Sequence, residues 1–170
     1  MTTENKTPNS VCLSSEEIAL AAEHITEHKA TKPFAKALLM AVNAGAFIAL
    51  AFMFYTTALA DGQGKLVGGL CFSLGLMLCV ILSGELFTSS TLTLVAKSAG
   101  LVTWRQVLKN WVIVYFGNLV GGLIIVFLVM LARQYNGFDG EWGRVILNTA
   151  QLYFKRKNLL VKSRFLIYSH

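Results

Sequence analysis

Three long apolar segments follow one another along most of this 170-residue chain. The first covers residues 37–60, the second 66–97 with an interruption near 83–87, and the third 109–133. An α-helix needs about 20 apolar residues to cross the roughly 30 Å hydrocarbon core of a bilayer. The pattern therefore predicts an all-α membrane protein with three spans, the second of them broken.

The second apolar segment is interrupted by residues that a lipid-facing helix would not carry. Residues 82–91 read Leu-Ser-Gly-Glu-Leu-Phe-Thr-Ser-Ser-Thr, with a glycine, a carboxylate and five hydroxyls. Lipid offers no partner for unpaired backbone groups, so irregular backbone inside a membrane implies surrounding protein or water. The charged Glu85 at this depth indicates a functional site. We interpret the interruption as a break between two half-helices that line a polar path for a small anion.

The residues after the break, 87–97, are too few to cross a membrane alone. On the broken-helix interpretation, Thr88, Ser89 or Ser90 caps the second half-helix, whose free N–H groups and positive dipole end attract an oxyanion. The alternative is one continuous, kinked helix whose hydroxyls donate to carbonyl groups of the preceding turn.

Two polar segments precede the first span. Residues 1–13 are expected to be disordered. Residues 14–30 begin with a capping box and carry an apolar stripe, which predicts a short amphipathic cytoplasmic helix. His24 and His28 lie one turn apart on this helix, either as two solvated side chains or as a metal-binding or proton-sensing pair.

Small residues at four-residue spacing predict close contacts between helices. Gly45 lies between two alanines in the first segment, Gly68 opens the second, and Gly117 and Gly121 form a GxxxG pattern in the third. The Leu-Val-Gly-Gly sequence shared by the second and third segments suggests that these two helices pack on each other. Asn43 is expected either to bond across a helix interface or to line the pore.

The composition is 55% hydrophobic with a formal net charge of +6, and the cations flank the apolar segments. This placement argues against nucleic-acid binding. Six cations on one side against three on the other place the N-terminus in the cytoplasm, and no signal peptide is visible. The six are Lys29, Lys32, Lys36, Lys97, Arg105 and Lys109, and the three are Lys65, Arg133 and Arg144.

Apart from the pair His24 and His28, the sequence shows no candidate enzymatic or metal-binding chemistry. Cys12, Cys71 and Cys79 lack metal-ligand spacing and are predicted to be small hydrophobic residues. No nucleophile–base pair or nucleotide-binding loop is visible, so we expect neither an enzyme nor a bound cofactor or metal.

The basic tail, residues 151–170, does not follow this plan. It carries five cations that would lie on the outer side, against the positive-inside rule, and no apolar run long enough to span a membrane. We expect it to lie outside the transmembrane half-domain of residues 34–150. Premature termination after a shifted reading frame is its expected origin.

Several motifs resemble the formate/nitrite transporter family, most closely its formate channel branch. They are Lys65-Leu-Val-Gly-Gly-Leu-Cys-Phe-Ser-Leu-Gly-Leu76, Gly84-Glu-Leu-Phe-Thr-Ser89, Lys109-Asn-Trp111 and Tyr115-Phe-Gly-Asn-Leu-Val-Gly-Gly122. The resemblance covers roughly residues 30–150. It implies half of an aquaporin-like bundle with two inverted halves, each containing a broken helix. It also implies a homopentamer in the inner membrane with one pore in each protomer.

The resemblance also assigns roles to residues around the break. Phe72 and Leu76 match the family's apolar constriction, and Phe87, which matches its central loop, is also assigned to the constriction. Leu86 and Thr88 match its central loop, where the threonine hydroxyl contacts the anion. The implied function is transport of small monovalent anions, formate first, with nitrite or hydrosulfide as alternatives.

Two further expectations follow from the resemblance. Residues 14–30 match the family's N-terminal helix, which is implicated in gating at the cytoplasmic mouth, and Glu85 is expected to be held by backbone hydrogen bonds. The family's second half is missing here, so the alternative function is a non-conducting membrane fragment. The expected partners are formate, the lipid bilayer and further copies of the chain.

Overall fold

The computed structural model describes the backbone of residues 14–167 and the side chains of residues 14–156. The segment 1–13, predicted to be disordered, lies outside the described residues. The regular elements in the described range are all helices: α1 (Ser15–Thr31), α2 (Phe34–Ala60), α3 (Gly64–Ile81), α4 (Phe87–Ser90), α5 (Thr93–Ser98), α6 (Trp104–Leu131), the 3-10 helix η1 (Gln134–Asn136) and α7 (Glu141–Ile167).

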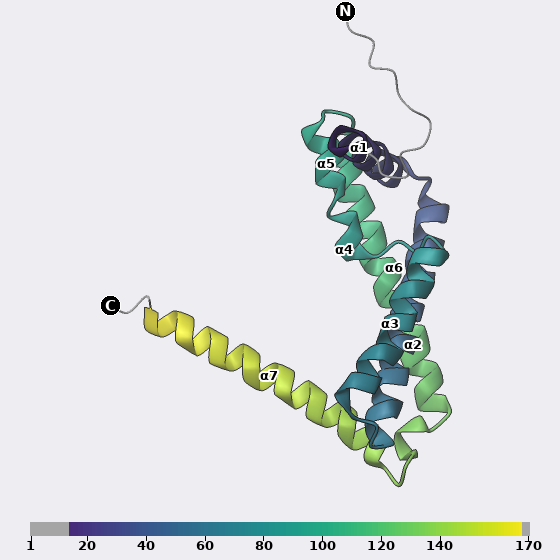
Figure 1. The fold of residues 1–170 in the computed structure, drawn as a ribbon, viewed down its shortest axis with the longest axis vertical. Helices are drawn as coiled ribbons and strands as arrows, with labels where there is room; N and C mark the ends of the chain where they lie inside the picture. Colours follow the sequence, from purple (N-terminus) through teal and green to yellow (C-terminus); the bar gives the residue numbers. More distant parts are fainter. Residues whose placement is uncertain (1–13, 168–170) are drawn as a thin grey trace, which may run out of the picture.

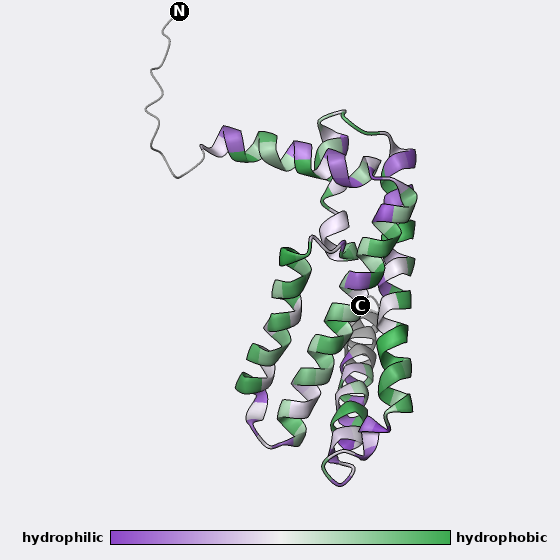
Figure 2. Ribbon diagram, turned by 90° about the vertical axis from the view of Figure 1, so that its right-hand side faces the viewer, coloured by the Kyte–Doolittle hydropathy of each residue, from purple (hydrophilic) through white to green (hydrophobic). Residues whose placement is uncertain are grey.

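Three of these helices, α2, α3 and α6, are long and apolar enough to cross a membrane. They run side by side, with α1 across one end and α7 projecting from the other (Figure 1). Figure 2, coloured by residue hydropathy, shows that these helices consist largely of hydrophobic residues, as expected for helices that face lipid. The predicted all-α membrane fold with three spans and a broken second helix is confirmed.

The third span begins earlier than predicted, at the start of α6. Thr103 and Gln106 form a capping box, in which the Gln106 N–H donates to the Thr103 hydroxyl at 3.4 Å and the Thr103 N–H donates to the Gln106 side chain at 2.7 Å. This motif satisfies free N–H groups of the first turn, and it therefore starts the helix before residue 109, where we had predicted the third span to begin.

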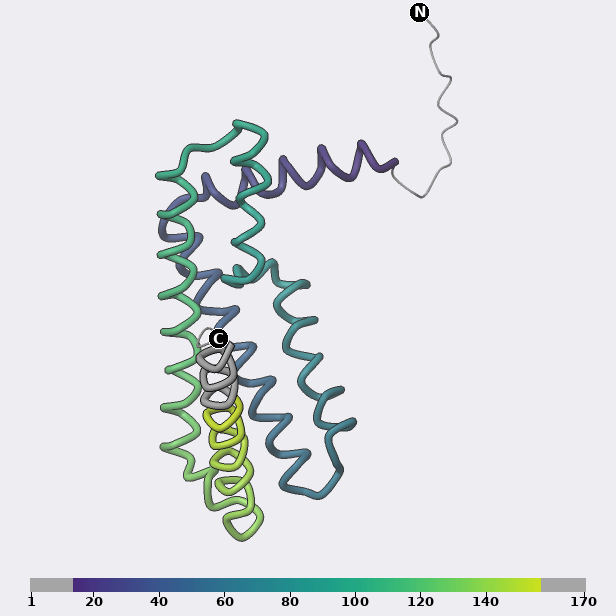
Figure 3. Tube along the Cα trace, turned by 90° about the vertical axis from the view of Figure 1, so that its left-hand side faces the viewer, coloured from purple at the N-terminus to yellow at the C-terminus, as the bar shows by residue number. Residues whose placement is uncertain are grey.

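The central helix of the three spans is α2, with α3 on one side and α6 on the other (Figure 3). Gly117 and Gly121 of α6 lie against Ala41 and Val42 of α2, and a Cβ at Gly121 would overlap the Val42 carbonyl. Gly45 of α2 in turn lies against the backbone of α6. The missing side chains allow the two backbones to approach closely.

Glycines of α3 bring that helix against the opposite side of α2. A Cβ at Gly68 would lie 3.0 Å from the ring of Tyr55, and Gly75 lies against Ala51. The prediction that the second and third spans pack on each other through their shared glycine motif is therefore wrong, and the second span contacts α6 mainly through α4 and α5. The small residues of both face the first span, whose alanines complement them.

Helix α3 ends in a hydrogen-bonded backbone motif typical of helix C-termini. Ser83 is left-handed, with φ of 53°, and its N–H donates to the Val80 carbonyl at 3.1 Å. The Gly84 N–H donates to the Cys79 carbonyl at 2.7 Å. Gly84 is suited to this place for a packing reason, because a Cβ there would lie 3.0 Å from the Cβ of Ala44.

The second half of the broken span consists of two short helices, α4 and α5, rather than one half-helix. The prediction that Thr88, Ser89 or Ser90 caps it is wrong, because Leu86 is the N-cap residue and α4 starts before all three hydroxyls. The Ser89 hydroxyl instead donates to the Leu86 carbonyl at 2.9 Å. A helix of four residues also lacks the aligned peptide dipoles of a long half-helix.

Helix α1 lies across the end of the bundle where α5 and α6 meet (Figure 3). Its predicted capping box is present, with the Ser14 N–H donating to the Glu17 carboxylate at 2.9 Å. The amide of Asn110 in α6 donates to the Lys29 carbonyl at 3.0 Å and so fixes the end of α1. A small buried cluster joins the three helices: Ala30, Ala96, Val102 and Val107.

Helix α7 starts at Glu141 and continues without interruption past residue 151, where we had placed the start of the basic tail. Trp142 anchors its first turn. This side chain is 3% exposed, and its indole N–H donates to the Thr57 hydroxyl at 3.1 Å. The rest of α7 projects away from the three spans (Figure 1).

Candidate functional site at the helix break

One asparagine of α6 holds the unwound segment between α3 and α4. The side-chain amide of Asn118 donates to the Glu85 carbonyl and to the Ala41 carbonyl, at 2.8 Å each. Its carbonyl oxygen accepts from the Phe87 N–H at 2.9 Å. Asn118 therefore satisfies backbone groups on both sides of the break, as irregular backbone inside a membrane requires.

Asn118 is a site residue that the sequence reasoning missed. We had considered Asn43 for a bond across a helix interface, but the structure leaves Asn43 exposed on α2. Both are amides in the apolar part of a membrane-spanning helix, so composition does not distinguish them. The distinguishing signal was the position of Asn118 inside the Gly117–Gly121 pattern, which faces a neighbouring helix.

The carboxylate of Glu85 is buried beside the break, at 2% exposure for the residue. The Lys29 ammonium lies 3.1 Å from one carboxylate oxygen, and the Lys32 ammonium contacts the other. Lys29 also donates to the Ser89 hydroxyl at 3.0 Å. The expectation that backbone hydrogen bonds hold the Glu85 carboxylate is wrong, because two ammonium groups hold it.

A basic cavity of about 1020 Å³ opens beside this cluster, between α1, the start of α2 and the end of α3. Three lysines and one carboxylate line it, so these four side chains carry a formal excess of two positive charges. The lining residues are His24, Ile25, His28, Lys29, Lys32, Lys36, Met40, Leu76, Cys79, Val80, Ser83, Gly84, Glu85, Leu86, Thr88 and Ser89.

A second hollow, the apolar groove, lies between α2, α3 and α6 and has a volume of about 570 Å³. Its lining residues are Gly45, Ile48, Ala49, Phe52, Phe72, Leu86, Asn118, Leu119, Gly122, Leu123 and Val126. Leu86 lines both the basic cavity and the apolar groove. Asn118 bonds to the backbone of Glu85 and of Phe87, the two neighbours of Leu86. It therefore holds in place the residue at which the two hollows meet.

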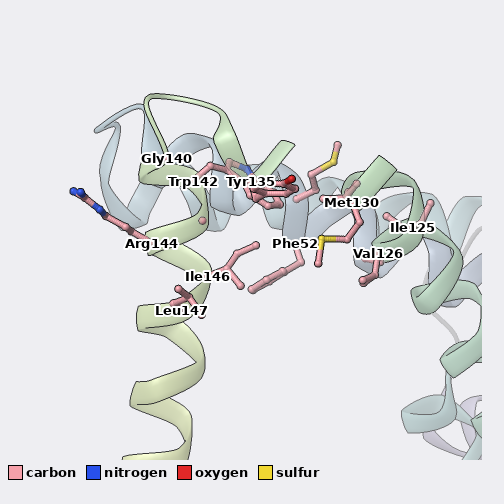
Figure 4. Close-up of a pocket in the computed structure, with 14 residues that line it drawn as sticks. Phe52, Ile125, Val126, Met130, Tyr135, Gly140, Trp142, Arg144, Ile146 and Leu147 are labelled. Atoms are coloured by element: carbon pink, nitrogen blue, oxygen red, sulfur yellow. The ribbon is translucent and has the colours of Figure 1, made fainter. Parts of the chain in front are cut away.

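A third hollow, the outer cavity, lies where α7 leaves the bundle and measures about 590 Å³. Figure 4 shows Phe52 and Ile146 reaching toward each other across it, with Trp142 and Tyr135 near the turn. It shares Ala49, Phe52 and Val126 with the apolar groove. The apolar surface of α2 and α6 therefore continues to this end, although no predicted site residue lines the outer cavity.

The structure places four of the predicted pore residues on the two inner hollows. Phe72 is half-buried and lines the apolar groove, while Leu76, 50% exposed, lines the basic cavity. Leu86 borders both, and Thr88 is exposed to the basic cavity. Residues far apart in the sequence are thus brought to the two sides of the break.

Phe87 lies differently from the other four. Its ring packs edge-on against two aromatic rings of α6, at centroid distances of 6.3 Å to Trp111 and 5.5 Å to Tyr115. It is not among the residues that line the basic cavity or the apolar groove. The contribution of Phe87 to a constriction stays a prediction.

The described range contains two histidines and two cysteines, three of which line the basic cavity. His24 and His28 line the basic cavity from α1. Cys79 is buried, with its sulfur 3.6 Å from the Ala44 carbonyl oxygen, and Cys71 is half-buried. Cys12 lies outside the described residues.

Comparisons with known proteins agree with this geometry. Residues 16–161 match the family model described as formate/nitrite transporter. The formate channel FocA of Escherichia coli K12 is 49% identical over 139 residues, covering 78% of this chain and 49% of the relative. FocA of Haemophilus influenzae is 46% identical over 157 residues, covering 89% and 55%.

A solved structure, a pentameric formate channel with formate bound, matches with a TM-score of 0.63 and 45% identity. The match covers 69% of this chain and 49% of that one. The chain thus spans about half the length of the relatives it matches. The family match reaches beyond residues 30–150 at both ends, into α1 and α7. With a family match over most of its length and close relatives that share it, the chain belongs to the formate/nitrite transporter family.

Proposed function

We propose that this protein transports small monovalent anions, formate first and nitrite as a second substrate, along a path that passes Leu86. The observation that carries the proposal is the position of Leu86, which borders the basic cavity on one side and the apolar groove on the other. Lysines of the basic cavity gather anions, and the hydroxyl of Thr88 offers a hydrogen bond. The apolar groove, with Phe72, disfavours ions that keep their water shell.

The relatives support formate as the substrate and a pentamer as the assembly. The Escherichia coli and Haemophilus influenzae proteins are named formate channels, and the matching structure is a pentamer with formate bound. We propose a homopentamer with one path in each protomer, several spans in the inner membrane and a cytoplasmic N-terminus. Phe72, Leu76, Leu86 and Thr88 line the path, with Phe87 supporting its wall.

A second candidate is a membrane fragment that does not conduct alone. The exposure of Leu76 and Thr88 favours it, because a closed pore would cover both residues and the described part of the chain leaves them open. The two candidates make opposite predictions for the same measurement.

Uptake of labelled formate into liposomes that contain only this chain tests the proposal. We expect uptake above protein-free liposomes, and a several-fold lower rate for Thr88→Ala, because one hydroxyl donor of the path is lost. Thr91→Ala is the matched control, since Thr91 is a nearby threonine that is absent from the lining of either hollow. No uptake by the parent chain would favour the fragment. Equal rates for Thr88→Ala and Thr91→Ala would remove Thr88 from the path.

A further inference from the structure

The cluster of Glu85, Lys29 and Lys32 has a feature that the proposed path does not require: one buried carboxylate is bound by two ammonium groups. We propose that Lys29 and Lys32 form a carboxylate-binding site in the wall of the basic cavity, and that the Glu85 carboxylate occupies this site as an internal competitor of free carboxylate anions. The proposal rests on the proposed function for the identity of the free anion, formate.

The geometry of the cluster is that of a bound carboxylate. Each oxygen of Glu85 contacts a different ammonium, Lys29 at 3.1 Å on one side and Lys32 on the other. The Ser89 hydroxyl, 3.0 Å from the Lys29 nitrogen, adds a polar group beside them. Formate carries the same pair of oxygens as the end of a glutamate side chain. The groups that bind Glu85 are therefore suited to formate as well.

The positive charge around the cluster exceeds the charge of Glu85, which favours binding of a free carboxylate in its place. Two lysines against one carboxylate leave one positive charge, and Lys36 in the same cavity adds a second. An ammonium has three N–H donors, of which Lys29 uses two on Glu85 and Ser89. His24 and His28 of α1 line the same cavity.

A free anion can reach this site. Lys29 and Lys32 line a cavity of about 1020 Å³, together with the exposed Thr88. The side chain of Lys29 keeps 20% of its surface exposed, against 3% for the carboxylate. The carboxylate is thus covered from outside, while one of the ammonium groups that bind it is partly open.

If Glu85 competes with formate, the direction in which formate affinity changes on removal of the Glu85 charge distinguishes the proposal from an ordinary ion pair. A group tethered beside its site acts at an effective concentration of about millimolar or more. Free formate must compete with this concentration in the parent chain. Removal of the Glu85 charge should therefore strengthen formate binding, whereas a purely structural ion pair predicts no gain when it is broken.

The test measures formate binding to the full chain in nanodiscs of zwitterionic lipid, by broadening of the ¹³C-formate NMR signal at constant ionic strength. We expect Glu85→Gln to lower the apparent dissociation constant for formate by about tenfold or more. Glu141→Gln is the matched control, because Glu141 pairs with Arg144 at 3.3 Å at the opposite end of the bundle. Lys32→Gln, added to Glu85→Gln, should abolish the gain.

Two outcomes overturn the proposal: formate binding to Glu85→Gln that is no tighter than to the parent, or a gain that survives Lys32→Gln. If circular dichroism shows that Glu85→Gln has lost helix, Glu85→Asp decides, because the shorter carboxylate cannot bridge both lysines equally well and should also tighten formate binding. Binding does not need transport, so a chain that binds formate but shows no uptake contradicts the proposed function alone. Uptake without a gain in Glu85→Gln contradicts the internal competitor alone.

Discussion

Single side chains decide how a broken helix survives inside a membrane. At the break, Asn118 serves three backbone groups that belong to two other segments of the chain. A short polar side chain in an apolar helix is costly unless every one of its hydrogen-bonding groups finds a partner. Here the amide of Asn118 and the unwound backbone satisfy each other's hydrogen-bonding groups, so neither is left unpaired in the membrane. The position of Leu86 therefore depends on Asn118.

We therefore expect Asn118→Leu to be strongly destabilising. Three buried backbone groups lose their partner at about 1–3 kcal/mol each, and relaxation reduces the total to about 2–4 kcal/mol. Unfolding in mixed micelles with a rising fraction of dodecyl sulfate measures the change. Asn43→Leu is the control, because Asn43 is exposed and its replacement should leave stability nearly unchanged. Similar losses for the two variants would contradict the role assigned to Asn118.

At the scale of elements, the fold depends on which side of each helix carries its small residues. Gly121 meets the Val42 carbonyl of α2, while its neighbour Gly122 has open space around it. Lipid-facing and helix-facing sides are both apolar, so hydrophobicity does not separate them, whereas side-chain size does. The same logic directs Gly68 and Gly75 of α3 to α2.

Alanine at two adjacent glycines should have opposite effects. Gly121→Ala forces α2 and α6 apart and should cost about 1–3 kcal/mol, as overpacking usually does. Gly122→Ala meets nothing within 4 Å and should stabilise the helix by up to about 1 kcal/mol. The detergent unfolding assay described for Asn118 measures both. A loss for Gly122→Ala as large as that for Gly121→Ala would show that α6 packs through another face.

At the scale of the whole molecule, the charges predict the orientation of the chain in the membrane. The positive-inside bias is counted within about 15–20 residues of the ends of the spans, so the cations from Lys155 onward lie too far beyond α6 to oppose it. This removes the conflict that the basic tail raised in the sequence. We therefore expect the basic cavity, with Lys29 and Lys32, on the cytoplasmic side.

Labelling of single cysteines in intact cells tests this orientation. In a background in which Cys12, Cys71 and Cys79 are replaced by serine, a membrane-impermeant maleimide should modify Asn136→Cys and leave Ser15→Cys unmodified until the cells are opened. The cation bias around the spans is the physical reason. Modification of Ser15→Cys in intact cells would place the basic cavity outside and contradict the orientation.

Local features of this chain were readable from the sequence because their causes are local. The spans follow from runs of apolar residues, the cap of α1 from Ser14 and Glu17, and the break from polar residues around Gly84. The family was readable for the same reason, since its motifs are continuous stretches. Of the predicted site residues, Leu86 and Thr88 could be named because they lie in one of these continuous family motifs, Gly84-Glu-Leu-Phe-Thr-Ser89.

The tertiary structure alone decided which residues from different helices meet. It selected Asn118 over Asn43, paired Glu85 with Lys29 and Lys32, and placed Phe87 against aromatic rings of α6. These contacts depend on the rotation and relative height of neighbouring helices. In helices that are apolar on every side, the hydrophobic pattern carries almost no information about either, so packing of small residues and satisfaction of a few buried polar groups determine them.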